Sequence, residues 1–272
     1  MFGIDDLRHA TPLPHAADSK WCVRCGTPYV YAAAYVGHLG DYRCPACGHS
    51  RPTLDVSGRA IELHGLASSR FELVTPDWKR TVRLGLPGLY NVYNAVAAAS
   101  LARELGASAD EIEHGLGSFS AAFGRFEHIP VGDRSLLVLL VKNPAGANEV
   151  VRTLVAGPAP TLAVVALNDG IADGQDVSWI WDVDWEPLLE RLERVVVTGS
   201  RAEELALRFT YAGFDERAVD VVPELARALD LGLELTPTRE RLFVLPTYTA
   251  MLALREILTE RGHARPYWER AA

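Results

Sequence analysis

The four cysteines of this 272-residue chain lie close together, in two pairs with the same internal spacing. Cys22 and Cys25 form the first pair, Cys44 and Cys47 form the second, and eighteen residues separate the pairs. A glycine follows each pair at once and permits the tight turn that points two thiolates at one ion. The pattern predicts a structural zinc site with four cysteine ligands, in a zinc ribbon over about residues 20–52.

Two disulfides are the alternative use of these cysteines. Near Met1 there is no basic segment followed by an apolar one, so we expect no secretory signal and a cytoplasmic protein. Disulfides do not persist in that compartment, which favours zinc. His38 and His49 lie nearby, but four thiolates complete a structural site. We therefore expect both histidines in solvated loops, and no open metal position for a substrate.

A second group of reactive side chains fills the segment from Asn168 to Glu186, with five aspartates, one glutamate and three of the six tryptophans. The segment follows residues 161–167, an apolar run of strand length. Ligands of α/β proteins bind at the carboxyl ends of parallel strands. The segment could therefore hold a cation, position a proton or contact a partner.

The acidic residues of this segment occupy different positions along it. Asp169 directly follows the apolar run and could orient a metal or nucleotide, or simply bond the turn. Asp182, Asp184 and Glu186 lie around the start of a predicted helix, where carboxylates act as caps and favour the positive end of the dipole. Asp176 lies in mid-loop, before any predicted helix.

The length and net charge of the chain exclude some classes of protein. A formal net charge of −8 and a pI of about 5.5 argue against a general nucleic-acid binder. The longest apolar runs, such as residues 136–141, are far shorter than the roughly 20 residues of a membrane helix. The chain is long enough for two domains, each with its own core.

From residue 134 the sequence alternates regularly between strand and helix patterns. The expected strands are 135–141, 161–167, 194–198, 218–222 and 241–245, and the expected helices are 146–155, 186–192, 202–212, 224–231 and 249–261. This alternation predicts a mostly parallel sheet covered by helices on both faces. Pro130 and Gly132 indicate the boundary, so we expect one domain over 1–131 and another over 132–272.

The first half has a less regular pattern. Short alternating stretches at 60–66, 71–75 and 81–86 predict strands, and residues 88–106 predict a helix that ends at Gly106. Ser108 and Glu111 have the spacing of a capping box and predict a second helix to about Leu116. The first twenty residues show no clear period.

Four stretches together resemble the Mur ligase family, and within it the MurT group. They are the ribbon; Gly88-Leu-Tyr-Asn91-Val-Tyr-Asn94-Ala at the head of a helix; Phe123-Gly124-Arg125-Phe-Glu127; and Lys142-Asn-Pro-Ala-Gly146, which accompanies the acidic segment and Thr198-Gly-Ser-Arg-Ala-Glu-Glu-Leu205. The resemblance implies an α/β fold, with part of a Mur ligase central domain that carries the ribbon. A Rossmann-like, mostly parallel C-terminal domain would follow.

The resemblance also implies an activity. Members of this group are carbon–nitrogen ligases of peptidoglycan synthesis that use ATP with Mg²⁺. They amidate the D-glutamate α-carboxylate of the lipid II stem peptide to D-isoglutamine, at the inner face of the cell membrane. The ammonia comes from glutamine through a glutaminase subunit, GatD, so the resemblance implies a heterodimer.

Single residues take roles from the same resemblance. Asn91 would hydrogen-bond the adenine, or else cap its helix, and Arg125 would reach the nucleotide across the domain interface. Lys142, the only lysine in the second half, would hold an anion at a helix N-terminus; a solvated lysine is the alternative. Asp176 would complete the Cys–His–Asp triad of the glutaminase.

Composition supports a site shared between two chains. No cysteine follows Cys47, and no histidine lies between residues 129 and 262, so Asp176 has no nucleophile or base close to it in sequence. A metal or nucleotide ligand and a purely structural role remain the alternatives for Asp176. The tryptophans of the acidic segment would anchor the interface, or else cover the sheet edge.

One motif of the family is missing from the sequence. Complete members begin with a phosphate-binding loop of the form G-T-N-G-K-T-T, but no glycine here is followed by lysine. We therefore expect that this chain alone does not phosphorylate a substrate. The alternatives are a non-catalytic module that only supports a glutaminase, and a folylpolyglutamate-type ligase. The ribbon and the absence of an Asp-His pair at 142–146 count against the latter.

Overall fold

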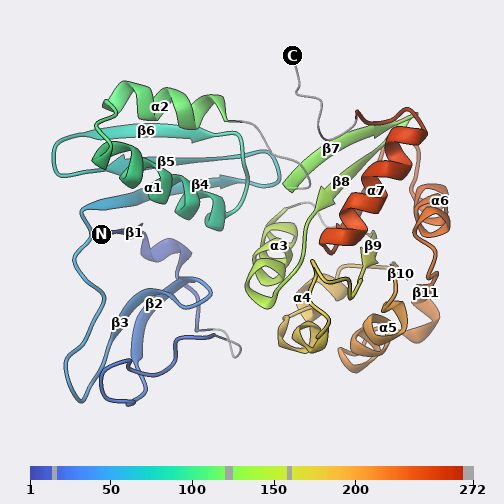
Figure 1. The fold of residues 1–272 in the computed structure, drawn as a ribbon, viewed down its shortest axis with the longest axis horizontal. Coiled ribbons are helices and arrows are strands. Elements are labelled where there is room, and N and C mark those ends of the chain that lie inside the picture. Colours follow the sequence, from blue (N-terminus) through green and yellow to red (C-terminus); the bar gives the residue numbers. More distant parts are fainter. Residues whose placement is uncertain (14–16, 120–124, 158–160, 266–272) are drawn as a thin grey trace. The chain divides into compact units, whose positions relative to one another are not determined.

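The computed structural model describes residues 1–13, 17–119, 125–157 and 161–265. The chain forms two compact units, Met1–Ser120 and Ala121–Ala272 (Figure 1). The division falls before the expected boundary at 131/132, because β7 (Arg125–Val131) pairs antiparallel with β8 (Arg134–Leu139). The residues expected to link two domains therefore form the turn of a hairpin in the second unit.

Unit 1 contains a four-stranded sheet in the order β1-β4-β5-β6. These strands are β1 (Phe2–Ile4), β4 (Val56–His64), β5 (Ser68–Val74) and β6 (Lys79–Leu84). β1 runs parallel to β4, and the other pairs are antiparallel. The three strands expected from the sequence are present, whereas β1 and the 3-10 helix η1 (Leu7–His9) lie where no period was visible.

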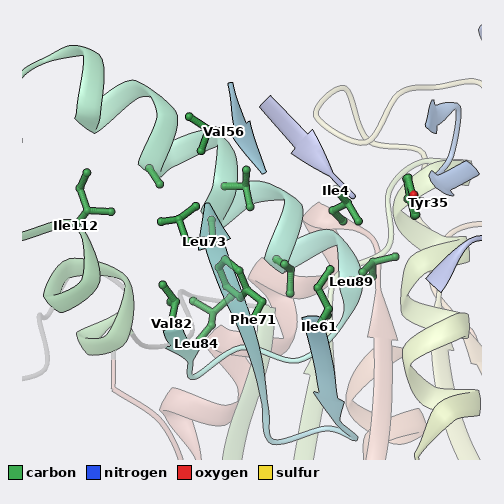
Figure 2. Packing of buried hydrophobic residues seen from close by; sticks show 14 of the residues in the cluster. Ile4, Tyr35, Val56, Ile61, Phe71, Leu73, Val82, Leu84, Leu89 and Ile112 are labelled. Carbon is green, nitrogen blue, oxygen red and sulfur yellow. The ribbon is translucent and has the colours of Figure 1, made fainter. Parts of the chain in front are cut away.

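Two helices complete unit 1, α1 (Leu89–Glu104) and α2 (Ala109–Ser118). The expected capping box of α2 is present: Ser108 Oγ accepts from Glu111 N–H (3.3 Å), and Glu111 Oε2 accepts from Ser108 N–H (2.8 Å). α1 packs on β1 and β4, and α2 packs on β6. Figure 2 shows the apolar side chains that meet there, among them Ile4, Phe71 and Leu73, all at most 1% exposed.

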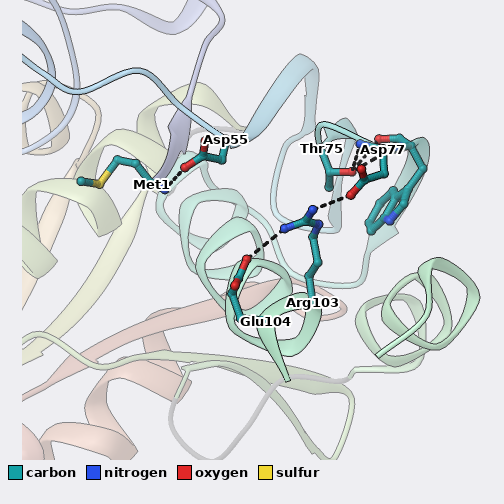
Figure 3. A network of polar contacts seen from close by, with 7 residues as sticks. Met1, Asp55, Thr75, Asp77, Arg103 and Glu104 are labelled. Carbon is teal, nitrogen blue, oxygen red and sulfur yellow. Dashed lines mark hydrogen bonds and ion pairs between the residues drawn. The ribbon is translucent and has the colours of Figure 1, made fainter. Parts of the chain in front are cut away.

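Polar contacts at the surface of unit 1 fix the ends of its elements. Arg103, in the last turn of α1, bonds Glu104 (2.9 Å) and also Asp77 in the turn before β6 (Figure 3). The Met1 amino group pairs with Asp55. Arg103 is half-buried but its partners Asp77 and Glu104 are exposed, so solvent screens these pairs and they add little to stability.

Unit 2 is built on a six-stranded sheet in the order β11-β10-β9-β12-β8-β7. Its strands after β8 are β9 (Leu162–Ala166), β10 (Arg194–Thr198), β11 (Val219–Val221) and β12 (Arg241–Pro246). All pairs are parallel except β7 with β8. The expected mostly parallel sheet is thus confirmed.

Helices alternate with these strands, as expected. They are α3 (Pro144–Ala156), α4 (Glu186–Leu189), α5 (Ala202–Tyr211), α6 (Leu225–Leu235) and α7 (Tyr248–Glu260), with short 3-10 turns η2 (Ser178–Asp182) and η3 (Glu216–Ala218). α6 and α7 pack on the face that presents Val164 and Val244. Residues of the opposite parity, such as Val165 and Val197, are equally buried, so both faces are covered.

α4 is shorter than the expected 186–192. The chain must enter β10 at once, and both Glu193 N–H and Arg194 N–H donate to the carbonyl of Thr161. Within the described part of the chain, each helix is too short or too polar to cross a bilayer.

Candidate functional site

The four cysteines lie on two turns of similar geometry at the base of a hairpin, β2 (Val30–Val36) and β3 (Leu39–Arg43). In each turn the glycine N–H donates to the carbonyl of the first cysteine, at 2.8 Å for Gly26 and 3.0 Å for Gly48. Both glycines have φ near +70° (71° and 75°), a conformation that other residues rarely adopt. The glycines therefore let each turn aim two sulfur atoms at one point.

All four sulfur atoms lie within 4.8 Å of one another. The Cys22–Cys47 and Cys25–Cys44 pairs are 3.5 Å apart, too far for a disulfide bond of about 2.05 Å. Tetrahedral zinc with Zn–S distances of about 2.3 Å requires sulfur atoms roughly 3.8 Å apart. The cluster therefore fits a metal ion held by four thiolates.

The surroundings of the sulfur atoms shift the pKa values of the cysteines in different directions. Burial opposes ionisation of Cys22, but the N–H groups of Arg24 and Cys25 outweigh it and lower its pKa to about 5. His49 N–H favours the Cys47 thiolate, yet burial and the neighbouring sulfurs raise the pKa of Cys47 to about 12. Four thiolates at neutral pH therefore require the positive charge of a metal.

Neither nearby histidine belongs to the cluster of metal-binding side chains found among the described residues. His38 is half-buried in the turn between β2 and β3, so it is not fully solvated as expected. The expectation of a solvated loop is likewise wrong for His49, which is half-buried. Its Nδ1 lies 2.6 Å from the Tyr29 hydroxyl, and its ring packs near Tyr29 and Tyr42. His49 thus supports the second cysteine turn by packing.

In unit 2, side chains from the carboxyl ends of three neighbouring strands meet. Asp169, just after β9, accepts from Ser200 Oγ (2.7 Å) and Arg201 Nε (2.7 Å), which follow β10. The hydrogen bonds from Ser200 and Arg201 hold the pKa of Asp169 below its usual value. Asp169 therefore bonds the turn that follows β10, which is the structural one of the roles expected for it.

A second set of contacts at this edge was not expected from the sequence. Thr249, after β12, donates its N–H to Asp173 Oδ1 (2.9 Å), and its hydroxyl also bonds the Asp173 carboxylate. Asn168 Nδ2 donates to the same hydroxyl (3.0 Å). Thr249 lies in the first turn of α7, and its partners are more than seventy residues away in sequence, so no local pattern indicated this contact.

Asp176 lies on the surface between this edge and η2, in mid-loop as expected. Its Oδ1 accepts from Ser178 N–H at 2.8 Å. The hydrogen bonds from Ser178 hold the pKa of Asp176 below its usual value, so its carboxylate is charged at neutral pH. Unit 2 has no cysteine, and its histidines are His128 and His263.

Asp182, Asp184 and Glu186 lie around the start of α4, as expected. The N-cap of α4 is Trp185, and no side chain caps that helix. Glu186 instead pairs with Arg208 (2.8 Å), whose guanidinium also donates to the carbonyl of Val183 (2.9 Å). Asp184 is bound through its backbone, with its N–H on Asn148 Oδ1 (2.8 Å). Among the described residues none of the three carboxylates caps α4, but Glu186 occupies its first turn, where the helix dipole favours a negative charge.

The three tryptophans of the segment differ in exposure, and Trp179 is half-buried. Trp185 is 1% exposed and donates its Nε1 to the carbonyl of Ile180 (3.2 Å), so it is a core residue and not an interface anchor. Trp181 is 43% exposed and lies edge-on to Tyr211, which is 74% exposed. Of the aromatic side chains expected at an interface, Trp181 is exposed, and Tyr211 lies beside it.

The residues expected near a nucleotide lie in both units. Asn91 is 7% exposed and donates to the carbonyl of Pro87 (2.7 Å); Gly88 is the N-cap of α1, so the capping alternative is wrong. Arg125 opens β7 opposite Leu139, but its side chain, like Phe123 and Gly124, is outside the described residues. Lys142 is exposed just before α3, at a helix N-terminus as expected.

Comparison with known proteins gives concordant results. Residues 140–251 match the family described as MurT ligase C-terminal. The MurT subunit of lipid II isoglutaminyl synthase (glutamine-hydrolyzing) from Streptococcus pneumoniae is 34% identical over 266 residues, which is 97% of this chain and 58% of that protein. The subunit of the same name from Staphylococcus aureus is 29% identical, over 94% of this chain and 56% of that protein.

Solved structures place the fold. A pseudomurein peptide ligase type C from Methanothermus fervidus superposes with a TM-score of 0.73 at 22% identity, over 96% of this chain and 52% of that chain. Identity at this level shows a Mur ligase-like fold and no more. The chain spans little more than half the length of the relatives it matches.

Proposed function

We propose that the chain acts as the MurT-type subunit of a glutamine-hydrolysing lipid II isoglutaminyl synthase, because residues 140–251 match the MurT ligase C-terminal family and the whole chain resembles MurT subunits. In this proposal the complex amidates the D-glutamate α-carboxylate of the lipid II stem peptide, at the inner face of the membrane. ATP activates the carboxylate as an acyl phosphate, and ammonia then displaces phosphate. The partner is a GatD-type glutaminase that releases the ammonia from glutamine.

Asp176 is the observation that supports this proposal most directly. It is an exposed, charged carboxylate on a loop of a unit that contains no thiol. In the proposed triad Asp176 accepts a hydrogen bond from the partner's histidine and fixes its tautomer. That histidine takes the proton of the partner's cysteine, and the thiolate attacks the glutamine amide. Ammonia leaves, and water then cleaves the thioester.

The cysteine cluster has a separate role. We propose that it holds Zn²⁺, because four thiolates form a closed tetrahedral set typical of structural zinc. No ligand position remains for a substrate, so the ion would stabilise the ribbon and take no part in amide formation.

We also propose that three residues contact the nucleotide. Lys142 is exposed at the N-terminus of α3 and makes no hydrogen bond or ion pair with the described residues, which suits binding of an anion. Asn91 still offers its side-chain oxygen to an adenine, because its amide nitrogen is the atom bound to Pro87. Arg125 is proposed as a third contact, to a phosphate.

The test is ammonia release by a GatD-type glutaminase with and without this chain, with ATP and lipid II added separately. We expect the chain to raise glutamine hydrolysis even without ATP. Because its sequence has no glycine–lysine pair, we expect no amidation of lipid II by these 272 residues and the glutaminase. An unchanged rate of glutamine hydrolysis would refute the proposed role, and robust amidation would refute the expected dependence on a phosphate-binding loop.

A further inference from the structure

Thr249 connects the start of α7 to the loop that carries Asp176. Its hydroxyl accepts from Asn168 Nδ2 (3.0 Å) and donates to Asp173 Oδ2. Its backbone N–H donates to the other carboxylate oxygen of Asp173 (2.9 Å). The hydroxyl of Thr249 therefore donates one hydrogen bond to the carboxylate of Asp173 and accepts one from the amide of Asn168.

Asn168 links this contact to two further strands. Its side-chain oxygen accepts from Ser200 N–H after β10 (3.0 Å), and its backbone N–H donates to Thr247 Oγ1 after β12 (3.0 Å). β10, β9 and β12 are neighbours in the sheet. The start of the loop is therefore bonded to three adjacent strand ends, which belong to the buried core of unit 2.

The loop itself is a closed turn between Asn168 and Asp176. Asp173 N–H and Gly174 N–H both donate to the carbonyl of Gly170, at 2.8 and 3.1 Å. A Cβ atom at Gly170 would lie 3.0 Å from Thr249 Cγ2, so glycine allows the turn to approach α7. Asp176 follows this turn by two residues, and its own carboxylate bonds Ser178.

We propose that Thr249 is a positioning residue for Asp176, and this inference rests on the proposed function. Through Asp173 it holds the turn before Asp176 against the end of the sheet. The carboxylate of Asp176 then meets the partner's histidine at a fixed distance. A displacement of about 1 Å at a reacting group can cost up to roughly 100-fold in rate.

The experiment compares Thr249→Val with Thr249→Ser in the complex with a GatD-type glutaminase. Valine keeps the shape but leaves the Asn168 amide and the Asp173 carboxylate facing a methyl group. We expect kcat for glutamine hydrolysis to fall about tenfold, with unchanged KM because glutamine binds in the partner, and with unchanged Kd for association. Serine restores the hydroxyl, so it should restore kcat.

A second variant, Asp173→Asn, tests the same contact if Thr249→Val does not fold. Asp173→Asn places an amide donor at the hydroxyl, which already accepts from Asn168, so the same fall in kcat is expected. Thr210→Val on α5 is the matched control, because its hydroxyl bonds only the carbonyl of Ala206 among the described residues (3.1 Å). Thermal unfolding of each variant identifies those that are folded.

The outcomes separate two claims. Wild-type kcat in folded Thr249→Val or Asp173→Asn, or a loss that follows only from a higher Kd, would overturn the role of Thr249. If Asp176→Asn abolishes the stimulation while these variants do not lower kcat, the positioning role alone fails. If Asp176→Asn has no effect, the proposed function fails with it.

Discussion

Trp181 and Trp185 lie four residues apart on one short segment and face opposite surroundings. Trp185 is 1% exposed, packs edge-on to Phe209 and donates to the carbonyl of Ile180. Trp181 is 43% exposed, with the Arg208 guanidinium 5.7 Å from its ring centre. One tryptophan thus anchors the segment in the core, and the other remains available to a partner.

The two positions predict that alanine lowers stability at Trp185 and lowers affinity for the partner at Trp181. Trp185→Ala should lower the free energy of unfolding by about 3–5 kcal/mol, because a large core side chain is lost. Trp181→Ala should leave stability almost unchanged but raise the Kd for the glutaminase at least about tenfold, as removal of an aromatic anchor does. Urea unfolding and titration calorimetry measure the two. An unchanged Kd for Trp181→Ala would place the contact surface elsewhere.

Metal content tests the cysteine cluster. We expect one zinc ion per chain by elemental analysis, and loss of it in Cys44→Ser, because a buried thiolate ligand is removed. Chelation should disorder the ribbon and lower the melting temperature. His38→Gln is the control and should retain zinc. A chain that binds no zinc with all four thiols reduced would contradict the assignment.

Glu149 predicts a pH dependence of stability. This carboxyl in α3 is 5% exposed, and burial raises its pKa to about 7, although Arg152 lies 3.4 Å away. The folded state therefore binds more protons than the unfolded state between pH 4.5 and about 7. The stabilisation by protonated Glu149 is fully present below pH 4.5 and is lost as the pH rises through 7.

Replacement of Glu149 isolates this effect. Glu149→Gln should be more stable than the natural chain at pH 8, by on the order of 3 kcal/mol, and nearly equal to it at pH 5. Urea unfolding at both pH values measures the difference. The exposed Glu193→Gln controls for the loss of one charge. A difference that is the same at both pH values would show that Glu149 does not titrate in this range.

The alternation of strands and helices after residue 134 was predictable, because most of the strands, such as β9 and β12, are apolar runs between turn residues. The hairpin of β7 and β8 does not follow from the sequence pattern. Gly132 looks like part of a linker, yet its φ of 59° lets the chain reverse between Val131 and Arg134, which pair across the turn. A turn and a linker share the same composition.

The candidate site was predictable only in part. The spacing of the cysteines is local, so it identified the cluster, and Asp176 was placed correctly in mid-loop. The contact of Asp173 with Thr249 joins residues seventy-six positions apart, and only the parallel sheet brings their strand ends together. The side-chain partner of Glu186 likewise depends on where α5 packs, so sequence pattern suggested a cap in place of an ion pair.

The central claim is that Asp176 completes an active site in a partner glutaminase. Its most direct test is kcat/KM for glutamine hydrolysis by a GatD-type glutaminase saturated with this chain, compared between Asp176→Asn and Asp182→Asn. Asp182 is an exposed carboxylate of the same segment and is the matched control. We expect a loss of stimulation by at least about 100-fold for Asp176→Asn, because the histidine loses its orienting carboxylate, and full stimulation for Asp182→Asn. Full stimulation by folded Asp176→Asn would contradict the central claim.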